Sequence, residues 1–261
     1  MGQPSFNDMI RAIIQALATT WRPCQPLLVM AVVIALVISA IFGLLAPGEV
    51  GAGLAGLPLM VLTLAVSAGV AGYLMTGEAA YTSLDGVFRE NRSYRFVFRY
   101  LLLSLGLSLP LVLMIPVLAG AAGGDAVGGG AALTALAMVA AIIYLVARLA
   151  VFPYTVFLPE PATLGESWQL TDGYVLRILG CIALFAVGIL GFVTLATMAL
   201  GGVIRGLGAA TGLGGGAAAT MALQSVGQIA VVYAIDCVYG TITRLLTAPD
   251  RPRLLPEDEE A

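Results

Sequence analysis

The amino-acid sequence predicts an all-α membrane protein with six transmembrane helices. Of its 261 residues, 60% are hydrophobic, and the mean hydropathy is +1.00. Only 10% carry a charge, against about 25% in a typical soluble domain, which is too few to cover the surface of a soluble fold. Six uncharged stretches are long enough to cross a bilayer, which takes about 20 apolar residues. They cover residues 23–48, 50–77, 100–124, 126–147, 178–204 and 206–235.

Glycine and proline residues trim these stretches to six predicted helices. The spans are expected near residues 27–46, 54–76, 101–120, 132–153, 178–200 and 217–244. The runs lack the period-two alternation of a transmembrane β-barrel, which leaves single helices as the spanning form. Residues 1–249 are therefore predicted to form one membrane domain. Residues 250–261 contain five acids and two arginines, and this composition predicts a disordered acidic tail.

Three segments that mix apolar and polar residues at helical spacing precede the first, third and fifth spans. They begin at Ser5, Ser83 and Thr163, which are 78 and then 80 residues apart. We expect residues 5–20, 83–97 and 163–176 to form cytoplasmic helices lying in the membrane interface. The period predicts a threefold repeat of an interfacial helix followed by a hairpin of two spans. The alternative is a six-helix bundle with ordinary loops. The expected apolar stripe of the first segment comprises Phe6, Ile10, Ile13, Ile14 and Leu17.

Orientation follows from the arginines. If the N-terminus is cytoplasmic, eleven of the 12 arginines fall on the cytoplasmic side, and only Arg205 falls outside. Because cytoplasmic segments of membrane proteins carry an excess of basic residues, this asymmetry predicts that both termini lie in the cytoplasm.

The residue inventory excludes several classes of enzyme. The sequence has no His and no Lys, so it cannot form a Ser–His, Cys–His or Ser–Lys pair or a zinc site built from Cys and His. An intramembrane aspartyl protease needs two facing carboxylates, and only Asp236 lies well inside a predicted span. We therefore expect no catalytic residues, no metal site, no cofactor and no nucleic-acid partner.

Two ionisable side chains are predicted to lie deep in the spans. We expect Arg148 and Asp236 to form an intramembrane ion pair, because an unpaired charge at this depth is costly. Two alternatives remain open: Asp236 lines a transport or proton-relay path, or both groups reach the membrane surface separately. A predicted polar stripe on the sixth span comprises Gln224, Gln228, Asp236 and Tyr239.

Four arginines before the third span recur at helical spacing: Arg89, Arg92, Arg95 and Arg99. This spacing predicts that they share one side of a helix, where they are candidate contacts for anionic lipid headgroups of the inner leaflet. The alternative is that they only determine topology and adhere to the membrane without specificity.

The stretch from Ile142 to Leu184 ends a span with arginine and proline, passes through an acidic turn and continues as Ser-Trp-x-Leu-Thr-x-Gly. It resembles six-span bacterial inner-membrane proteins related to the membrane domain of glycerophosphoryl diester phosphodiesterase. The resemblance implies a location in the bacterial inner membrane. Relatives fused to the phosphodiesterase keep their catalytic residues in a separate soluble domain, so we do not expect hydrolase activity here. The matching positions are Arg148, Pro153, Glu160, Ser167, Trp168, Leu170, Thr171 and Gly173.

These observations give three functional hypotheses. The first is a non-enzymatic inner-membrane protein that binds lipid or organises a membrane protein partner. The second is a small transporter or channel that uses the polar stripe of the sixth span. The third, with least support from the residues, is an enzyme acting on lipid.

Overall fold

The computed structural model describes residues 4–45, 49–122, 128–211 and 216–247. Within these residues it contains α-helices and two short 3₁₀ helices, and no strand. The acidic tail predicted at 250–261 lies outside the described residues. The elements in chain order are α1 (Phe6–Leu45), α2 (Glu49–Thr76), η1 (Ala79–Thr82), α3 (Leu84–Arg89), α4 (Asn91–Ala122), α5 (Gly128–Leu149), η2 (Tyr154–Phe157), α6 (Leu164–Leu170), α7 (Val175–Thr211) and α8 (Gly216–Thr247).

The structure confirms an all-helical fold with helices suited to a membrane. Four helical stretches in the described residues are long and apolar enough to cross one: Phe6–Phe42, Gly53–Thr76, Leu136–Phe157 and Leu223–Thr247. A fifth is obtained if α6 and the first part of α7 count as one span, although the two helices meet at 86°. The predicted spans 101–120 and 178–200 lie inside α4 and α7. A total of six spans stays a prediction.

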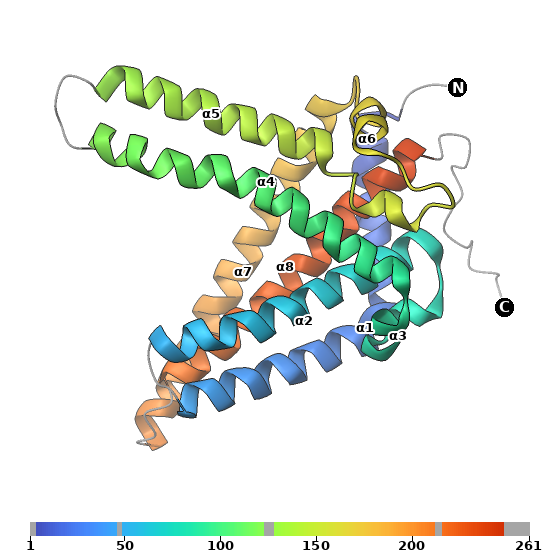
Figure 1. Cartoon of the computed structure of the whole chain (residues 1–261). Coiled ribbons are helices and arrows are strands. Elements are labelled where there is room, and N and C mark those ends of the chain that lie inside the picture. Colours follow the sequence, from blue (N-terminus) through green and yellow to red (C-terminus); the bar gives the residue numbers. More distant parts are fainter. Residues whose placement is uncertain (1–3, 46–48, 123–127, 212–215, 248–261) are drawn as a thin grey trace.

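The first helix differs from expectation. We expected a separate interfacial helix at 5–20 and a span from residue 27, but α1 is one helix of 40 residues. Figure 1 shows that α1 is bent; its first part packs against α7 and α8, and its longer second part lies beside α2. Pro23 and Pro26 lie inside the helix, and proline bends a helix because it lacks a backbone N–H and its ring crowds the preceding turn. We call residues 6–22 the N-terminal limb.

The N-terminal limb packs through a face that the sequence analysis only partly identified. Met9, Ile13 and Ala16 are buried, whereas Ile14 of the expected apolar stripe is exposed. The buried face contacts a cluster that includes Ile178 of α7 and Ile242 of α8. Residues 9, 13 and 16 fall on one helical face. The limb is thus part of the protein core.

The larger core cluster lies between α1, α2 and α8. Aromatic side chains from the connecting segments close its end. Phe96 of α4 lies with its ring 5.4 Å from that of Tyr154 in η2, and Tyr81 of η1 lies 5.5 Å from Phe157. A Cβ at Gly72 would lie 2.3 Å from the Tyr81 ring, so that glycine provides the space for it. The two 3₁₀ helices are therefore anchored in the core.

Three helix starts share the same local construction. The Ser5 hydroxyl accepts a hydrogen bond from the N–H of Asp8 (3.2 Å), and the Asp8 carboxylate accepts one from the Ser5 N–H. Ser83 caps α3 by accepting from the Gly86 N–H. Thr163 and Glu166 form a reciprocal capping box at α6. Each cap satisfies an N–H that a helix start leaves free.

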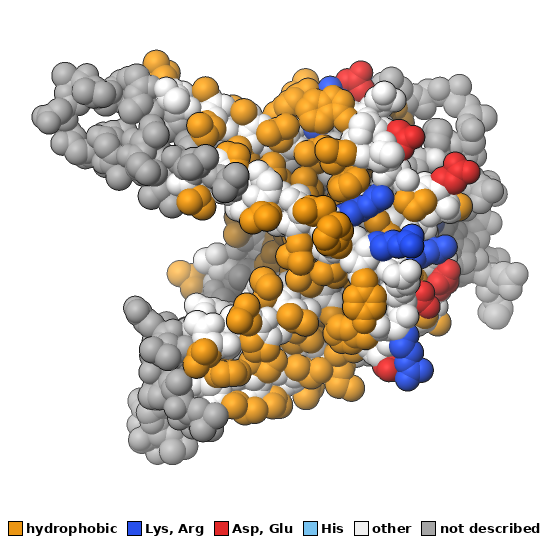
Figure 2. All heavy atoms as spheres, in the orientation of Figure 1, with side chains coloured by type: hydrophobic (Ala, Val, Ile, Leu, Met, Phe, Trp, Pro, Cys, Tyr) orange, Lys and Arg blue, Asp and Glu red, His pale blue; other side chains and the backbone are white. Residues whose placement is uncertain are grey.

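Charged side chains gather at one end of the molecule. In Figure 2 the acidic and basic residues lie along the edge occupied by α3, α6 and the start of α4, and apolar side chains cover most of the remaining described surface. The first residues of α1 and the last of α8 lie at this same end (Figure 1). We call this region the charged end.

Candidate functional site

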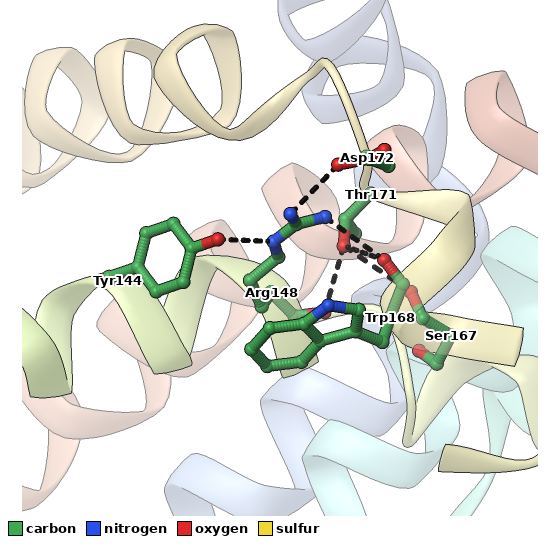
Figure 3. A network of polar contacts seen from close by, with 6 residues as sticks. All are labelled: Tyr144, Arg148, Ser167, Trp168, Thr171 and Asp172. Carbon is green, nitrogen blue, oxygen red and sulfur yellow. Dashed lines mark hydrogen bonds and ion pairs between the residues drawn. The ribbon is translucent and has the colours of Figure 1, made fainter. Parts of the chain in front are cut away.

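Arg148 is the centre of a polar network that joins α5 to the turn between α6 and α7 (Figure 3). It lies in the last turn of α5 and is 8% exposed. Its guanidinium donates to the Tyr144 hydroxyl at 2.9 Å, to the Trp168 carbonyl at 3.1 Å and to the Asp172 carboxylate at 2.8 Å. The planar guanidinium supplies several donors in fixed directions, which suits it to bind three acceptors at once.

The Ser-Trp-x-Leu-Thr-x-Gly motif forms the other half of this network. The Trp168 ring lies under the Arg148 guanidinium at 4.9 Å, a favourable cation–π contact. The Thr171 hydroxyl donates to the Arg148 carbonyl oxygen at 3.1 Å and lies 3.0 Å from the Trp168 carbonyl oxygen. Gly173 has φ +75°, a left-handed conformation that glycine adopts at no steric cost. The motif therefore builds a tight turn that joins α6 to α7 and holds the end of α5.

The expected ion pair between Arg148 and Asp236 is not formed. Arg148 pairs with Asp172, while Asp236 lies in α8 against α2 and η2. Depth in a helix predicts that both groups are buried, but it does not predict their partners, which come from other segments. Asp172 and Tyr154 were not identified as partners from the sequence. The available signal was the spacing of Tyr144 and Arg148, which places them on one face of a helix.

Asp236 is enclosed by hydroxyl donors. It is 1% exposed, and its Oδ1 accepts hydrogen bonds from Ser67 of α2 at 2.8 Å and from Tyr154 of η2 at 2.7 Å. Its Oδ2 has no hydrogen-bond partner among the described residues. The bonds join three elements at one carboxylate, which fits a structural role because a buried polar group is costly without partners.

The predicted polar stripe of the sixth span is divided in the structure. Gln224 and Gln228 are exposed, Asp236 is buried and Tyr239 is intermediate. The inward face of this part of α8 instead carries Ser225, whose hydroxyl lies 3.2 Å from that of Ser39 in α1. The four residues of the predicted stripe therefore differ in burial, and the described residues do not bring the two glutamines to the buried position of Asp236.

The four arginines before the third span do not share one helix face. Arg89 ends α3, and the helical path breaks at Glu90, which has an extended backbone, before α4 begins. Arg89 pairs with Asp85 at 3.0 Å, and Arg92 lies 4.0 Å from Glu78. Arg95 is exposed.

Arg99 has a different role from its three neighbours. It is half-buried and donates to the carbonyls of Phe152 and Ala162, at 3.3 and 3.0 Å, and to the Thr155 hydroxyl. Burial, followed by the charge of Arg95, lowers the pKa of Arg99. Arginine nevertheless stays protonated at physiological pH. Arg99 therefore fixes the segment after α5, and it is removed from the predicted headgroup contacts.

Three further arginines bind backbone carbonyls in the same way. Arg148 binds Trp168, Arg177 donates to the Pro4 carbonyl at 2.8 Å, and Arg244 donates to the Leu74 carbonyl at 2.9 Å. Together with Arg99 we call them the carbonyl-binding arginines. Each joins segments that lie apart in the sequence. A signal was present in the composition, because every basic side chain in the sequence is arginine and only arginine offers this multidentate geometry.

An apolar groove of about 670 Å³ lies between α1, α7 and α8. It is lined by α1 from Ile10 to Val32, by α7 around Gly188 and by α8 from Val226 to Ala234. Trp21 stands at its side, with its ring 5.7 Å from that of Tyr233. The Tyr233 hydroxyl donates to the Leu17 carbonyl at 2.7 Å, so the polar atom of that side chain is satisfied. We call this feature the α1–α7–α8 groove.

Comparison with known proteins gives no relative. No family model, no curated protein and no solved structure matches this chain. The resemblance of residues 142–184 to the phosphodiesterase-related membrane proteins therefore stays a prediction, and the geometry of the described residues carries the functional argument.

Proposed function

We propose that the chain is a non-enzymatic multi-pass protein of the bacterial inner membrane that binds anionic lipid headgroups at its charged end. The observation that carries this proposal is the position of Arg89, Arg92 and Arg95. All three are exposed; Arg89 ends α3, and Arg92 and Arg95 lie near the start of α4, at the charged end. Arg89 and Arg92 lie 3.0 and 4.0 Å from Asp85 and Glu78, but exposed ion pairs contribute little, so both arginines stay available to a headgroup. Near an anionic membrane surface each such charge contributes about 1 kcal/mol of attraction.

The proposed topology has six spans and both termini in the cytoplasm. Three hairpins, α1–α2, α4–α5 and α7–α8, supply the spans, and each follows a helix start capped at Ser5, Ser83 or Thr163. The order of a 3₁₀ helix and then a short helix occurs twice, as η1–α3 and as η2–α6. The 86° angle between α6 and α7 supports an interfacial α6, because a helix perpendicular to a span lies along the membrane surface. The capped starts occur in all three units and support the threefold repeat, whereas, among the described residues, a separate short helix is present only in the second and third units.

The transport hypothesis has less support. It depends on a polar path along the sixth span, but Gln224 and Gln228 are exposed whereas Asp236 is buried. Asp236 is instead held by Ser67 and Tyr154. Lipid binding is the function that the described residues support better.

Measuring retained lipid tests the proposal. The protein is purified from membranes that contain phosphatidylglycerol, exchanged into fresh detergent, and the phosphatidylglycerol bound per chain is determined by mass spectrometry. Replacing Arg89, Arg92 and Arg95 together by Gln should reduce the retained lipid several-fold. The matched control replaces the same three residues by Lys, which preserves the charge and should preserve retention. Equal retention by the Gln variant and the unmodified protein would overturn the proposal.

A further inference from the structure

The α1–α7–α8 groove extends along α1 through the bend at the two prolines. On α1 it is lined at positions 10, 14, 17, 21, 28 and 32, and these spacings of three, four and seven keep one helical face toward the groove. The groove therefore begins on the N-terminal limb, at the charged end, and continues along the apolar second part of α1. A ligand that follows it would need a polar end and a long apolar part.

Two arginines flank the beginning of the groove. Arg11 and Arg22 directly follow the groove-lining residues Ile10 and Trp21. They are 11 residues apart, about three helical turns, so they lie on the same flank of the limb. Both are exposed. The neighbouring acid, Asp8, stays negatively charged, because its hydrogen bonds to Ser5 and the charge of Arg11 lower its pKa. With Arg11 and Arg22 against this one acid, the limb still offers a net positive charge to an anionic group.

The size of the groove matches one lipid chain. Its volume is about 670 Å³. An acyl chain of about 16 to 18 carbons, at about 30 Å³ per methylene, close to the share of one water in the liquid, needs about 500 Å³ and fits.

We propose that the α1–α7–α8 groove holds one acyl chain of an anionic phospholipid, with the lipid headgroup on the flank of the N-terminal limb that carries Arg11 and Arg22. This inference rests on the proposed function in lipid binding and assigns it a specific site. Trp21 lies at the junction, where an amphipathic indole ring suits the boundary between headgroup and chain. The tyrosine at position 233 keeps the groove wall apolar, since its hydroxyl is bound to the Leu17 carbonyl.

Trp21 provides the probe for the test. The sequence contains two tryptophans, so a Trp168→Phe background leaves Trp21 as the only one. The protein is placed in nanodiscs that contain rising fractions of phosphatidylglycerol or phosphatidylcholine with brominated acyl chains, which quench indole fluorescence on contact. Half-maximal quenching should occur at a several-fold lower fraction of brominated phosphatidylglycerol than of brominated phosphatidylcholine. Identical curves for the two lipids would overturn the proposal.

Two glycines of α7 give a matched pair of groove variants. A Cβ at Gly188 or at Gly191 would meet no other atom within 4 Å, so a larger side chain is tolerated at both. Only Gly188 lines the groove. Gly188→Leu should fill the groove and abolish the preference for brominated phosphatidylglycerol, whereas Gly191→Leu should retain it. Equal behaviour of the two variants would overturn the assignment of the groove.

A third variant separates the headgroup from the chain. Replacing Arg11 and Arg22 together by Gln should move the phosphatidylglycerol curve onto the phosphatidylcholine curve while quenching persists.

If the Arg89, Arg92 and Arg95 variant loses retained lipid but Gly188→Leu keeps its preference, the groove proposal fails and the proposed function stands. If Gly188→Leu keeps the preference for brominated phosphatidylglycerol and the Arg89, Arg92 and Arg95 variant keeps its retained lipid, the groove proposal and the proposed function both fail. If the protein forms a dimer and Gly188→Leu dissociates it, the groove holds a second copy of the chain, and the lipid proposal is overturned.

Discussion

At the scale of single residues, one guanidinium holds three segments of the chain together. Arg148 binds the Tyr144 hydroxyl, the Trp168 carbonyl and the Asp172 carboxylate. We expect Arg148→Lys to lower the midpoint of thermal unfolding in detergent by several degrees, because an ammonium cannot reproduce the planar set of donors. Asp172→Asn should cost much less, since the Asp172 side chain is 76% exposed and exposed ion pairs contribute little. Equal losses from the two variants would contradict this ranking.

Asp236 leads to a second residue-scale prediction. Asp236→Asn keeps an oxygen acceptor for Ser67 and Tyr154, so it should destabilise the protein less than Asp236→Ala does. Asp236→Ala leaves the hydroxyls of Ser67 and Tyr154 without an acceptor and should destabilise the protein by about 1–3 kcal/mol. Denaturant or thermal unfolding in detergent measures both. The effects of Arg148→Lys and Asp236→Asn should also add, because no bond joins the two residues. A large coupling free energy between Arg148 and Asp236 would contradict this expectation and support an ion pair between them.

The depth of these two charges can be predicted from the sequence, whereas their partners cannot. Depth within a helix follows directly from the sequence, and both Arg148 and Asp236 are buried in the structure. The partners Asp172 and Tyr154 lie in a turn and in a 3₁₀ helix, and the position of such segments depends on how the chain folds back. That path is a tertiary property, so charge balance alone selected the wrong pair.

At the scale of elements, the tight contact between η1 and α3 depends on one glycine. A Cβ at Gly86 would lie 2.0 Å from the Ala80 carbonyl oxygen, a backbone atom that cannot move away easily. We expect Gly86→Ala to cost about 1–3 kcal/mol, the usual range for overpacking. The matched control is Gly165→Ala in α6, where the added Cβ meets nothing within 4 Å and should stabilise by up to about 1 kcal/mol. Thermal unfolding of both variants checks the contrast.

Local signals predicted where elements begin, and they failed where an element continues or breaks. Ser5, Ser83 and Thr163 were chosen as the starts of units, and each proves to be a capping residue. Capping is a property of four adjacent residues, so it can be seen in the sequence. The structure has α1 continuous through Pro23 and a break at Glu90, and neither follows from the residues next to it alone.

At the scale of the whole molecule, the charged end should face the cytoplasm. Cysteines introduced at residues 125 and 210 should react with a membrane-impermeant maleimide in intact cells, whereas Glu160→Cys at the charged end should react only after permeabilisation. The native residues Cys24, Cys181 and Cys237 are buried, so they should give little background. Reaction at Glu160→Cys in intact cells would reverse the proposed orientation.

The carbonyl-binding arginines imply that the fold and its membrane contacts respond differently to ionic strength. Raising salt from about 0.1 to 1 M shortens the screening length from about 10 to 3 Å, which weakens attraction between exposed charges. Arg99, Arg148, Arg177 and Arg244 bind backbone oxygens at 2.8 to 3.3 Å, where little solvent intervenes. The midpoint of thermal unfolding should therefore stay nearly constant over this range, while phosphatidylglycerol retained through Arg89, Arg92 and Arg95 should fall. The protein would release its headgroup contacts in high salt and remain folded.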